Sequence, residues 1–207
     1  MKVYLLDVTK FKDKLLFSEY YDKMPIRRKV KIDSYKHNTD RIRSLSNGYL
    51  LKKYVGNEDK FIYNEFDKPM IKNNKDNIYF NISDHGNYSV LIVDDKECGI
   101  DIQKISDLRE STIKKHTVLE EYNYIVNADS ILNEYTRMWC YKESYIKYKG
   151  FGKSKDPRDL KFDFNNTLTD NNHKVPCYFH EYLLDNYKIV ACSENKKFPE
   201  LEIVEIK

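Results

Sequence analysis

The chain has 207 residues, a formal net charge of +3 and 41% hydrophobic residues, a composition typical of a globular protein with one large domain or two small ones. The small net charge argues against a fold built as a whole to bind nucleic acid. No apolar run approaches the roughly 18 residues that a membrane-spanning helix needs. The cysteines Cys98, Cys140, Cys177 and Cys192 form no C-x-x-C pair, so we expect reduced core residues of a cytoplasmic protein rather than a zinc site.

The order of apolar and polar segments predicts an α+β protein. The apolar segment 2–8 is too short for a signal peptide and predicts a strand. Two helices are expected next, the second with Asp40 in its first turn and Gly56 just after its end. A loop rich in Asn and Lys follows at 67–77. The other expected elements are strands 78–82, 88–94 and 98–103, a helix opening at 118–122, a helix from 129 to 149 ended by Gly150, and strands 160–164, 176–184, 187–193 and 201–206.

The two helices expected at 25–36 and 39–55 carry much of the local positive charge. Lys and Arg clearly outnumber Asp between residues 23 and 43. Such an excess suits an anionic ligand, although it also fits a solvated helix face. The basic residues are Lys23, Arg27, Arg28, Lys29, Lys31, Lys36, Arg41 and Arg43, and the acidic residues in or beside the segment are Asp22, Asp33 and Asp40.

A short sequence pattern occurs once in each half of the chain. Y-F at 79–80 precedes N-Y at 87–88 and an apolar run, and Y-F at 178–179 precedes N-Y at 186–187 and an apolar run at the same spacing. Short matches of this kind also arise by chance. We expect two similar α+β halves, 1–104 and 105–207, related by a pseudo-twofold axis, each with a small, mainly antiparallel sheet and packed helices. A ligand would then lie between the halves.

Residues 99–103, with the sequence G-I-D-I-Q, predict a strand with two chemically different faces. Side chains alternate along a strand, so Asp101 and Gln103 share one face and the two isoleucines share the other. Gly99 would let another part of the chain approach the backbone closely. Two side-chain oxygens beside a glycine suit a hard cation such as Mg²⁺. The same pattern also fits a half-buried strand with a polar outer face.

Residues 139–147, with the sequence W-C-Y-K-E-S-Y-I-K, lie in the long expected helix. Trp139, Glu143 and Lys147 are four residues apart, so they share one face of that helix, flanked by Lys142 and Ile146. A carboxylate between an aromatic ring and a lysine can act as a metal ligand or as a general base. It can equally form half of an exposed ion pair, which stabilises by only about 0.3–0.5 kcal/mol.

Residues 79–86, with the sequence Y-F-N-I-S-D-H-G, predict a strand that ends in a polar turn. Ser83, the amides of the turn and His85 could hold phosphate oxygens. A single histidine in a turn also fits a solvated surface residue.

The order and spacing of these three segments resemble those of the 4′-phosphopantetheinyl transferase family, in its longer, surfactin-synthetase-activating type. G-I-D at 99–101 and W-x-x-K-E-S-x-x-K at 139–147 are the specific part of the signature, and F-N-I-S at 80–83 precedes them. The resemblance spans most of the chain, and this type resembles two fused copies of a smaller α+β unit. Upstream it extends to Lys68-Pro69, Arg28, Lys31, the run from Asp40 to Arg43, and Leu50-Leu51.

This resemblance implies an enzyme that transfers the 4′-phosphopantetheine arm of coenzyme A to a serine of an apo acyl or peptidyl carrier protein and releases adenosine 3′,5′-bisphosphate. By position, Asp101, Gln103 and Glu143 would bind Mg²⁺. Glu143, directly or through a water, would take the proton of the serine, and Lys147 would steady the pyrophosphate as charge builds on the leaving group. The resemblance assigns the rest of coenzyme A to Arg28, Lys31, Arg43, Lys68, Ser83, His85 and Lys147.

The chain departs from the family pattern at two positions. Gln103 stands where the family usually has a second acid, so the site has one negative charge fewer and should bind a metal ion more weakly. Asp84 stands where the family usually has a phosphate-contacting histidine, and His85 comes one place later. A shift of the turn by one residue would return His85 to the phosphate, whereas without it Asp84 would face the anion.

Two other functions stay open on the sequence. The departures at Gln103 and Asp84 fit a catalytically weak or inactive module that binds coenzyme A or a carrier protein. The basic helices also fit a nucleic-acid binder, although the small net charge counts against this class. We expect a monomeric cytoplasmic protein with no nucleic-acid or membrane partner.

Overall fold

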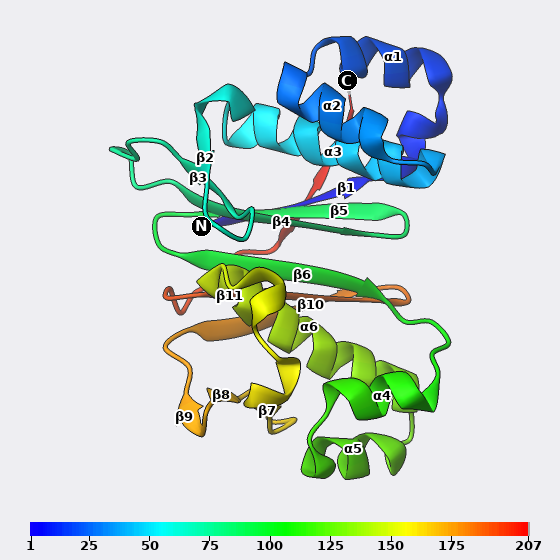
Figure 1. The fold of residues 1–207 in the computed structure, drawn as a ribbon, viewed down its shortest axis with the longest axis vertical. Helices are drawn as coiled ribbons and strands as arrows, with labels where there is room; N and C mark the ends of the chain where they lie inside the picture. Colours follow the sequence, from blue (N-terminus) through cyan, green and yellow to red (C-terminus); the bar gives the residue numbers. More distant parts are fainter. Residues whose placement is uncertain (207) are drawn as a thin grey trace.

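The computed structural model describes residues 1–206 and has an α+β fold in which two β-sheets lie between two groups of helices (Figure 1). The helices are α1 (Lys14–Asp22), α2 (Ile26–Ser34), α3 (Asn38–Tyr54), α4 (Glu110–His116), α5 (Leu119–Val126) and α6 (Ile131–Lys149). The strands are β1 (Lys2–Asp7), β2 (Phe61–Tyr63), β3 (Pro69–Ile71), β4 (Tyr79–His85), β5 (Tyr88–Asp94), β6 (Cys98–Lys104), β7 (Leu160–Phe162), β8 (Leu168–Asp170), β9 (His173–Lys174), β10 (Tyr178–Leu184), β11 (Tyr187–Ser193) and β12 (Leu201–Val204).

The sequence correctly predicted the longer elements. Both basic helices, the strand pair around the first N-Y dipeptide, the G-I-D strand and the long helix ended by Gly150 are all present. Gly150 has a φ of 71°, the left-handed conformation that commonly ends helices. Helices α1 and α4 were not predicted, and β3 lies within the loop expected at 67–77. Along the part of the chain that the structure describes, no helix combines the length and apolar character needed to cross a membrane.

The two main sheets repeat one arrangement of three strands. Their strand orders are β12-β1-β5-β4 and β10-β11-β6. In the first sheet, the β4–β5 hairpin pairs antiparallel with β1, and in the second, the β10–β11 hairpin pairs antiparallel with β6. A backbone N–H after the third strand donates to the turn of each hairpin, from Val8 to Asn87 at 2.9 Å and from Ile105 to Asn186 at 2.7 Å. Both hairpins expected from the repeated sequence pattern are therefore formed.

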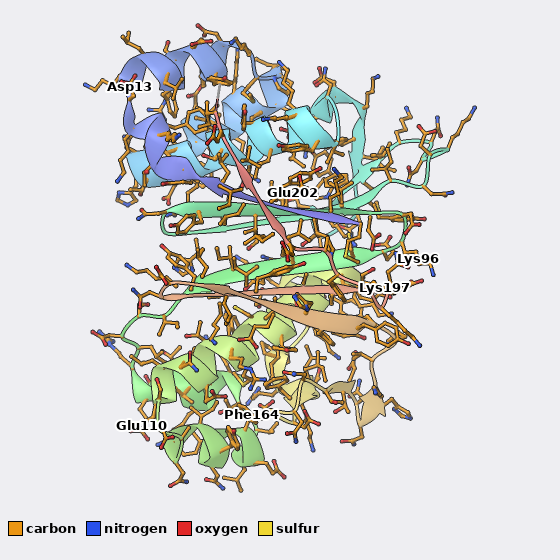
Figure 2. All side chains as sticks on the ribbon, turned by 180° about the vertical axis from the view of Figure 1, so that it is seen from behind. Asp13, Lys96, Glu110, Phe164, Lys197 and Glu202 are labelled. Atoms are coloured by element: carbon orange, nitrogen blue, oxygen red, sulfur yellow. The ribbon has the colours of Figure 1, made fainter. Side chains whose placement is uncertain are left out.

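The backbone pairing crosses the expected boundary between residues 104 and 105. β6 precedes this boundary but pairs with β11 of the second sheet. β12 follows it but pairs in parallel with β1 of the first sheet. Figure 2, the view from behind, shows β12, which carries the labelled Glu202, on the near side next to β1. The division into residues 1–104 and 105–207 thus stays a prediction. Each of the two sheets contains one strand from the other side of this boundary.

Three apolar cores hold the layers together. One lies between α1–α3 and the first sheet, one between the two sheets, and one between the second sheet and α6. The four cysteines are free and buried in these layers, as the sequence predicted. The third core also brings two backbones into contact, because a Cβ on Gly99 of β6 would collide with the carbonyl of Ser144 and the backbone nitrogen of Tyr148. The prediction that Gly99 permits a close approach is confirmed, and the partner is α6.

Candidate active site

Strands β4 and β6 run side by side, at neighbouring edges of the two sheets, and side chains join them where no backbone ladder forms. Because side chains alternate along a strand, every second residue of β4 faces β6. The hydrogen bonds run from Ile100 N to Asn81 Oδ1 at 3.0 Å, from Ser83 Oγ to Asp101 Oδ1 at 2.9 Å, and between His85 Nδ1 and Gln103 Oε1 at 2.6 Å. The polar face of β6, which includes Gly99, therefore lies toward α6, and it meets the side chains of β4 at the edge of the sheet.

Helix α6 adds two charged side chains to this junction. The ammonium of Lys147 lies 2.5 Å from Asp101 Oδ1 and 2.7 Å from Ser83 Oγ. Trp139, Glu143 and Lys147 line the same cavity, so the predicted shared helix face is confirmed. The structure thus brings together Ser83 from the first sheet, Asp101 from the second and Lys147 from α6.

The two carboxylates and the lysine influence one another electrostatically. Burial raises the pKa of Glu143 above its ordinary value, and the negative charge of Asp101 raises it further, whereas Lys147 lowers it. Burial lowers the pKa of Lys147, but the facing Asp101 carboxylate outweighs this effect and the pKa ends above its usual value. Glu143 makes no hydrogen bond within residues 1–206, so its half-buried carboxylate is left to interact with a ligand.

A long cleft leads from this junction to the basic helices. The cavity beside α6 has a volume of about 820 Å³, and a second cavity of about 610 Å³ lies against α2 and α3. Asp67, Pro69 and Ile82 border both cavities, so the two adjoin. Lys31 and Arg43 lie at the far end, where a smaller cavity continues the second. Together these cavities provide a route along which a long anionic molecule could lie between the first helices and α6.

Lys31 and Arg43 differ in how much of their charge is compensated by the chain. Lys31 has an exposed side chain and no ion-pair partner among residues 1–206, but its ammonium lies in the cleft, where partial loss of water together with the charge of Arg28 lowers its pKa below the ordinary value. Arg43 pairs with Asp84 at 3.0 Å and with Asp40 one helical turn earlier. Asp84 also accepts a hydrogen bond from Asn47 at 2.6 Å. The negative charge that Asp84 brings to the cleft is therefore balanced within the chain.

Arg28 and Lys68 are engaged by other parts of the chain. Arg28 is buried and forms a two-pronged pair with Glu58, with both N–O distances at 2.8 Å. Lys68 donates to the carbonyl of Tyr148 at 2.7 Å, near the end of α6, and pairs with Glu97 at 2.8 Å. Both border a cleft cavity, but each ammonium or guanidinium group has a carboxylate partner already. Their roles toward a ligand stay predictions.

The turn expected after Ser83 does not shift by one residue, because β4 continues as a strand to His85. Alternation then separates the two residues in question. Asp84 points into the cleft with Ile82, while His85 points toward β6 and borders a different cavity of about 190 Å³. The structure thus leaves Asp84 at the cleft, with its charge balanced by Arg43, and puts His85 against Gln103.

The comparisons with known proteins agree with this geometry. Residues 97–193, which carry Asp101, Glu143 and Lys147, match the model of the 4′-phosphopantetheinyl transferase superfamily. The 4′-phosphopantetheinyl transferase Sfp of Bacillus subtilis (strain 168) is 28% identical over 188 residues, which cover 84% of this chain and 83% of that protein. The chain is therefore similar to 4′-phosphopantetheinyl transferases over most of its length.

Two further relatives extend the similarity along the chain. The 4′-phosphopantetheinyl transferase ffp of Bacillus subtilis is 26% identical over 219 aligned positions, which cover 97% of this chain and 95% of that protein. The 4′-phosphopantetheinyl transferase gsp of Aneurinibacillus migulanus is 29% identical and covers 83% of this chain and 77% of its own length. The similarity therefore includes the helices of the first half as well as the matched region.

The donor groups of this site fit a divalent cation bound by two carboxylates. Asp101 raises the pKa of Glu143 through its negative charge, so a cation between them would be favoured. The carbonyl oxygen of Gln103, the third expected ligand, is already occupied because it accepts a hydrogen bond from His85. Within residues 1–206, no group of three or more His, Cys, Asp or Glu side chains is arranged to hold a metal ion. The remaining ligands would have to come from a substrate or from water.

Sequence reasoning missed several residues that shape the cleft. His116 stacks on Trp139 with ring centroids 4.4 Å apart and hydrogen-bonds Tyr135 at 2.7 Å, and burial lowers its pKa. Lys153 and Lys155, in the loop after α6, line the larger cavity. The basic run 149–155 beside Gly150 is a signal that could have indicated these lysines, whereas nothing in the local sequence relates His116 to Trp139.

Proposed function

We propose that this protein transfers the 4′-phosphopantetheine arm of coenzyme A to a serine of an apo acyl or peptidyl carrier protein and releases adenosine 3′,5′-bisphosphate. The observation that carries the proposal is the arrangement of Asp101, Glu143 and Lys147 at the inner end of a cleft with basic residues at its other end. The match of residues 97–193 to the model of the 4′-phosphopantetheinyl transferase superfamily and the similarity to proteins bearing that name support it.

In the proposed reaction, the serine oxygen attacks the pyrophosphate phosphorus that carries the pantetheine arm. A new phosphorus–oxygen bond forms, and the bond to the bridging oxygen breaks, so adenosine 3′,5′-bisphosphate leaves with the electron pair. Glu143 takes the serine proton. Its raised pKa brings the carboxylate closer to the basicity that a general base needs near neutral pH. Lys147 supports the negative charge that develops on the phosphate oxygens.

We further propose that Mg²⁺ binds between Asp101 and Glu143, with Gln103 as the weakest candidate ligand. When bound, Mg²⁺ would neutralise the pyrophosphate and position it for in-line displacement. Lys31 and Arg43 would bind the phosphates at the far end of the cleft, with Ser83 and Lys68 beside the pyrophosphate and nucleotide. Arg28 would act chiefly by supporting the wall of the cleft, because Glu58 already compensates its charge. For His85, the proposed contact with phosphate requires the ring to leave Gln103.

The proposal includes two similar halves related by a pseudo-twofold axis, and a monomer that works in the cytoplasm. The repeated three-strand arrangement of the two sheets supports the first point. Four buried, free cysteines suit a reducing compartment.

The decisive test is Mg²⁺-dependent labelling of several apo carrier proteins with a fluorescent coenzyme A analogue. We expect labelling by the native protein and a loss of about 10²–10⁴-fold in the Glu143→Gln variant, because a general base typically contributes this much. Circular dichroism would verify that the variant is folded. Absence of labelling on every carrier tested would reject the transferase proposal.

A second candidate function is a catalytically weak or inactive module that binds coenzyme A. The observation that favours it is the pairing of Asp101 with Lys147 and Gln103, which satisfies both carboxylate oxygens. This candidate predicts tight binding of coenzyme A without labelling, and no gain of labelling in the Gln103→Glu variant.

A further inference from the structure

Gln103 lies between two polar side chains of the site and bonds to both. Its Nε2 donates to Asp101 Oδ2 at 2.9 Å, and its Oε1 accepts from His85 Nδ1 at 2.6 Å. An ionised carboxylate only accepts hydrogen bonds, so the amide must turn its NH₂ group toward Asp101. The carbonyl is then left for His85. Asp101 therefore determines which way the Gln103 amide points.

The same reasoning determines the state of the histidine ring. A carbonyl oxygen also only accepts hydrogen bonds, so His85 must carry a proton on Nδ1. Its other nitrogen, Nε2, is then the atom available to the neighbouring cavity of about 190 Å³. Asp101 thus fixes the orientation of the Gln103 amide, and this amide in turn fixes which nitrogen of the His85 ring carries the proton.

The other oxygen of Asp101 is also satisfied by the chain. Asp101 Oδ1 faces the ammonium of Lys147 at 2.5 Å and the hydroxyl of Ser83 at 2.9 Å, and its side chain is only 1% exposed. A glutamate at position 103 could not donate to Asp101 and would add a second negative charge beside it. With glutamine there, the carboxylate has a full set of partners, including a positive charge, from side chains alone.

We propose that Gln103 is a positioning residue that holds the Asp101 carboxylate and the His85 ring in fixed orientations before any divalent cation binds. This inference rests on the proposed function only in taking Asp101 as a place where such a cation binds. With glutamine at 103, the cation meets two carboxylates and one lysine, whereas glutamate would supply a third carboxylate. The native site should therefore have a lower intrinsic affinity for divalent cations than the Gln103→Glu variant.

Gln103 offers a specific spectroscopic probe, because it is the only glutamine in the sequence. In the full-length protein with ¹⁵N-labelled glutamine, with EDTA and without coenzyme A, we expect one side-chain amide pair whose exchange with solvent is at least about tenfold slower than in the free amino acid. Asp101→Ala should return this signal to free-amide behaviour, and Gln103→Met should remove the His85 Nδ1–H signal. A mobile, unprotected amide that becomes fixed only when Mg²⁺ is added would overturn the proposal.

The affinity for Mn²⁺, measured by electron paramagnetic resonance without coenzyme A, supplies an independent test. We expect Gln103→Glu to bind Mn²⁺ about tenfold more tightly than the native protein, because of the added charge at short range. Ser106→Glu, which adds the same charge at an exposed residue just after β6, should change the affinity less than about twofold. Equal affinities of the native protein and Gln103→Glu would contradict the proposal. None of these readouts requires carrier labelling, so its failure and that of the transferase proposal are distinguishable.

Discussion

The ammonium of Lys147, on α6, lies 2.5 Å from the carboxylate of Asp101, on β6, although the two residues are 46 positions apart in the chain. This pair spans the junction of a strand and a helix that are packed backbone against backbone. Glu143 lies one helical turn before Lys147 and makes no hydrogen bond of its own within residues 1–206. The site therefore holds one carboxylate that is compensated by the chain and one that is free to react with a ligand.

The free carboxylate should reduce the stability of the fold at neutral pH. A carboxyl group whose pKa is raised in the folded protein favours folding while it is protonated, below its unfolded pKa of about 4.3. This contribution is lost as the pH rises through the higher folded value. We expect Glu143→Gln to raise the melting temperature by roughly 2–4 °C at pH 8 and to have little effect near pH 4.

Thermal unfolding at the two pH values would measure this difference. Glu120→Gln, at an exposed residue of α5, controls for the loss of one negative charge at the surface. A lower melting temperature for Glu143→Gln at pH 8 would contradict the expected cost of the buried charge.

Lys31 should affect the binding of coenzyme A more than it affects folding. It is exposed at the basic end of the cleft, so its removal takes no group out of a packed core. We expect Lys31→Ala to raise the KM for coenzyme A about tenfold or more, since a hydrogen bond to a charged group is worth about 1.5–3 kcal/mol. Lys36→Ala, which removes a nearby exposed charge that does not line the cleft, should leave KM within about twofold. An unchanged KM in Lys31→Ala would remove Lys31 from the cofactor site.

Asp84 should weaken the binding of an anion in the same cleft. Its carboxylate borders the cavities beside Lys31 and Arg43 and is balanced by Arg43 at 3.0 Å. Asp84→Asn removes the negative charge and leaves Arg43 with more of its positive charge for the ligand. We expect the KM for coenzyme A to fall about two- to fivefold, with a smaller effect at high salt. Asp33→Asn, an exposed partner of Arg41, is the matched control, and a rise in KM for Asp84→Asn would show that this charge helps binding.

Lys142 should act in stability, although it belongs to the W-x-x-K-E-S-x-x-K segment. Its side chain is fully buried and pairs with Glu121 of α5 at 2.7 Å. Breaking a buried ion pair on one side typically costs about 3–5 kcal/mol, so Lys142→Met should lower the free energy of unfolding by this amount. Urea unfolding would measure it, and a loss below about 1 kcal/mol would refute the assignment.

The double variant Lys142→Met with Glu121→Met removes both charges of this pair and tests whether the loss of stability comes from the unpaired Glu121 carboxylate. Glu121 also accepts hydrogen bonds from the backbone nitrogens of Val118 and Phe162. The double variant should therefore recover only part of the lost stability, because the buried N–H of Phe162 and the half-buried N–H of Val118 remain without their acceptor.

The sequence predicted the elements whose signals are local. A hairpin has its turn residues and both apolar strands within one short segment, and α6 has both its periodicity and the glycine that ends it. Helix α1 was missed because none of its residues is buried, which leaves little apolar periodicity in Lys14–Asp22 to detect. The short strands β2 and β3 depend on one another and give even weaker local signals.

The candidate site residues could be named from the sequence, but the side chains that contact them could not. Gly99, Asp101, Glu143 and Lys147 could be identified from their spacing and their resemblance to a family. The partner of Arg28 lies 30 positions away at Glu58, and no local pattern relates the two. Likewise, the alternation that separates Asp84 from His85 is visible only once β4 is known to continue through both residues.

The contact at Gly99 has a consequence for how this site tolerates sequence change. The strand that bears Asp101 touches the helix that bears Glu143 through bare main chain, so no variable side chain acts as a spacer between the two carboxylates. Substitutions elsewhere in the core can alter packing without changing this separation. Any larger residue at position 99 would push the strand and the helix apart, and would therefore separate Asp101 from Glu143.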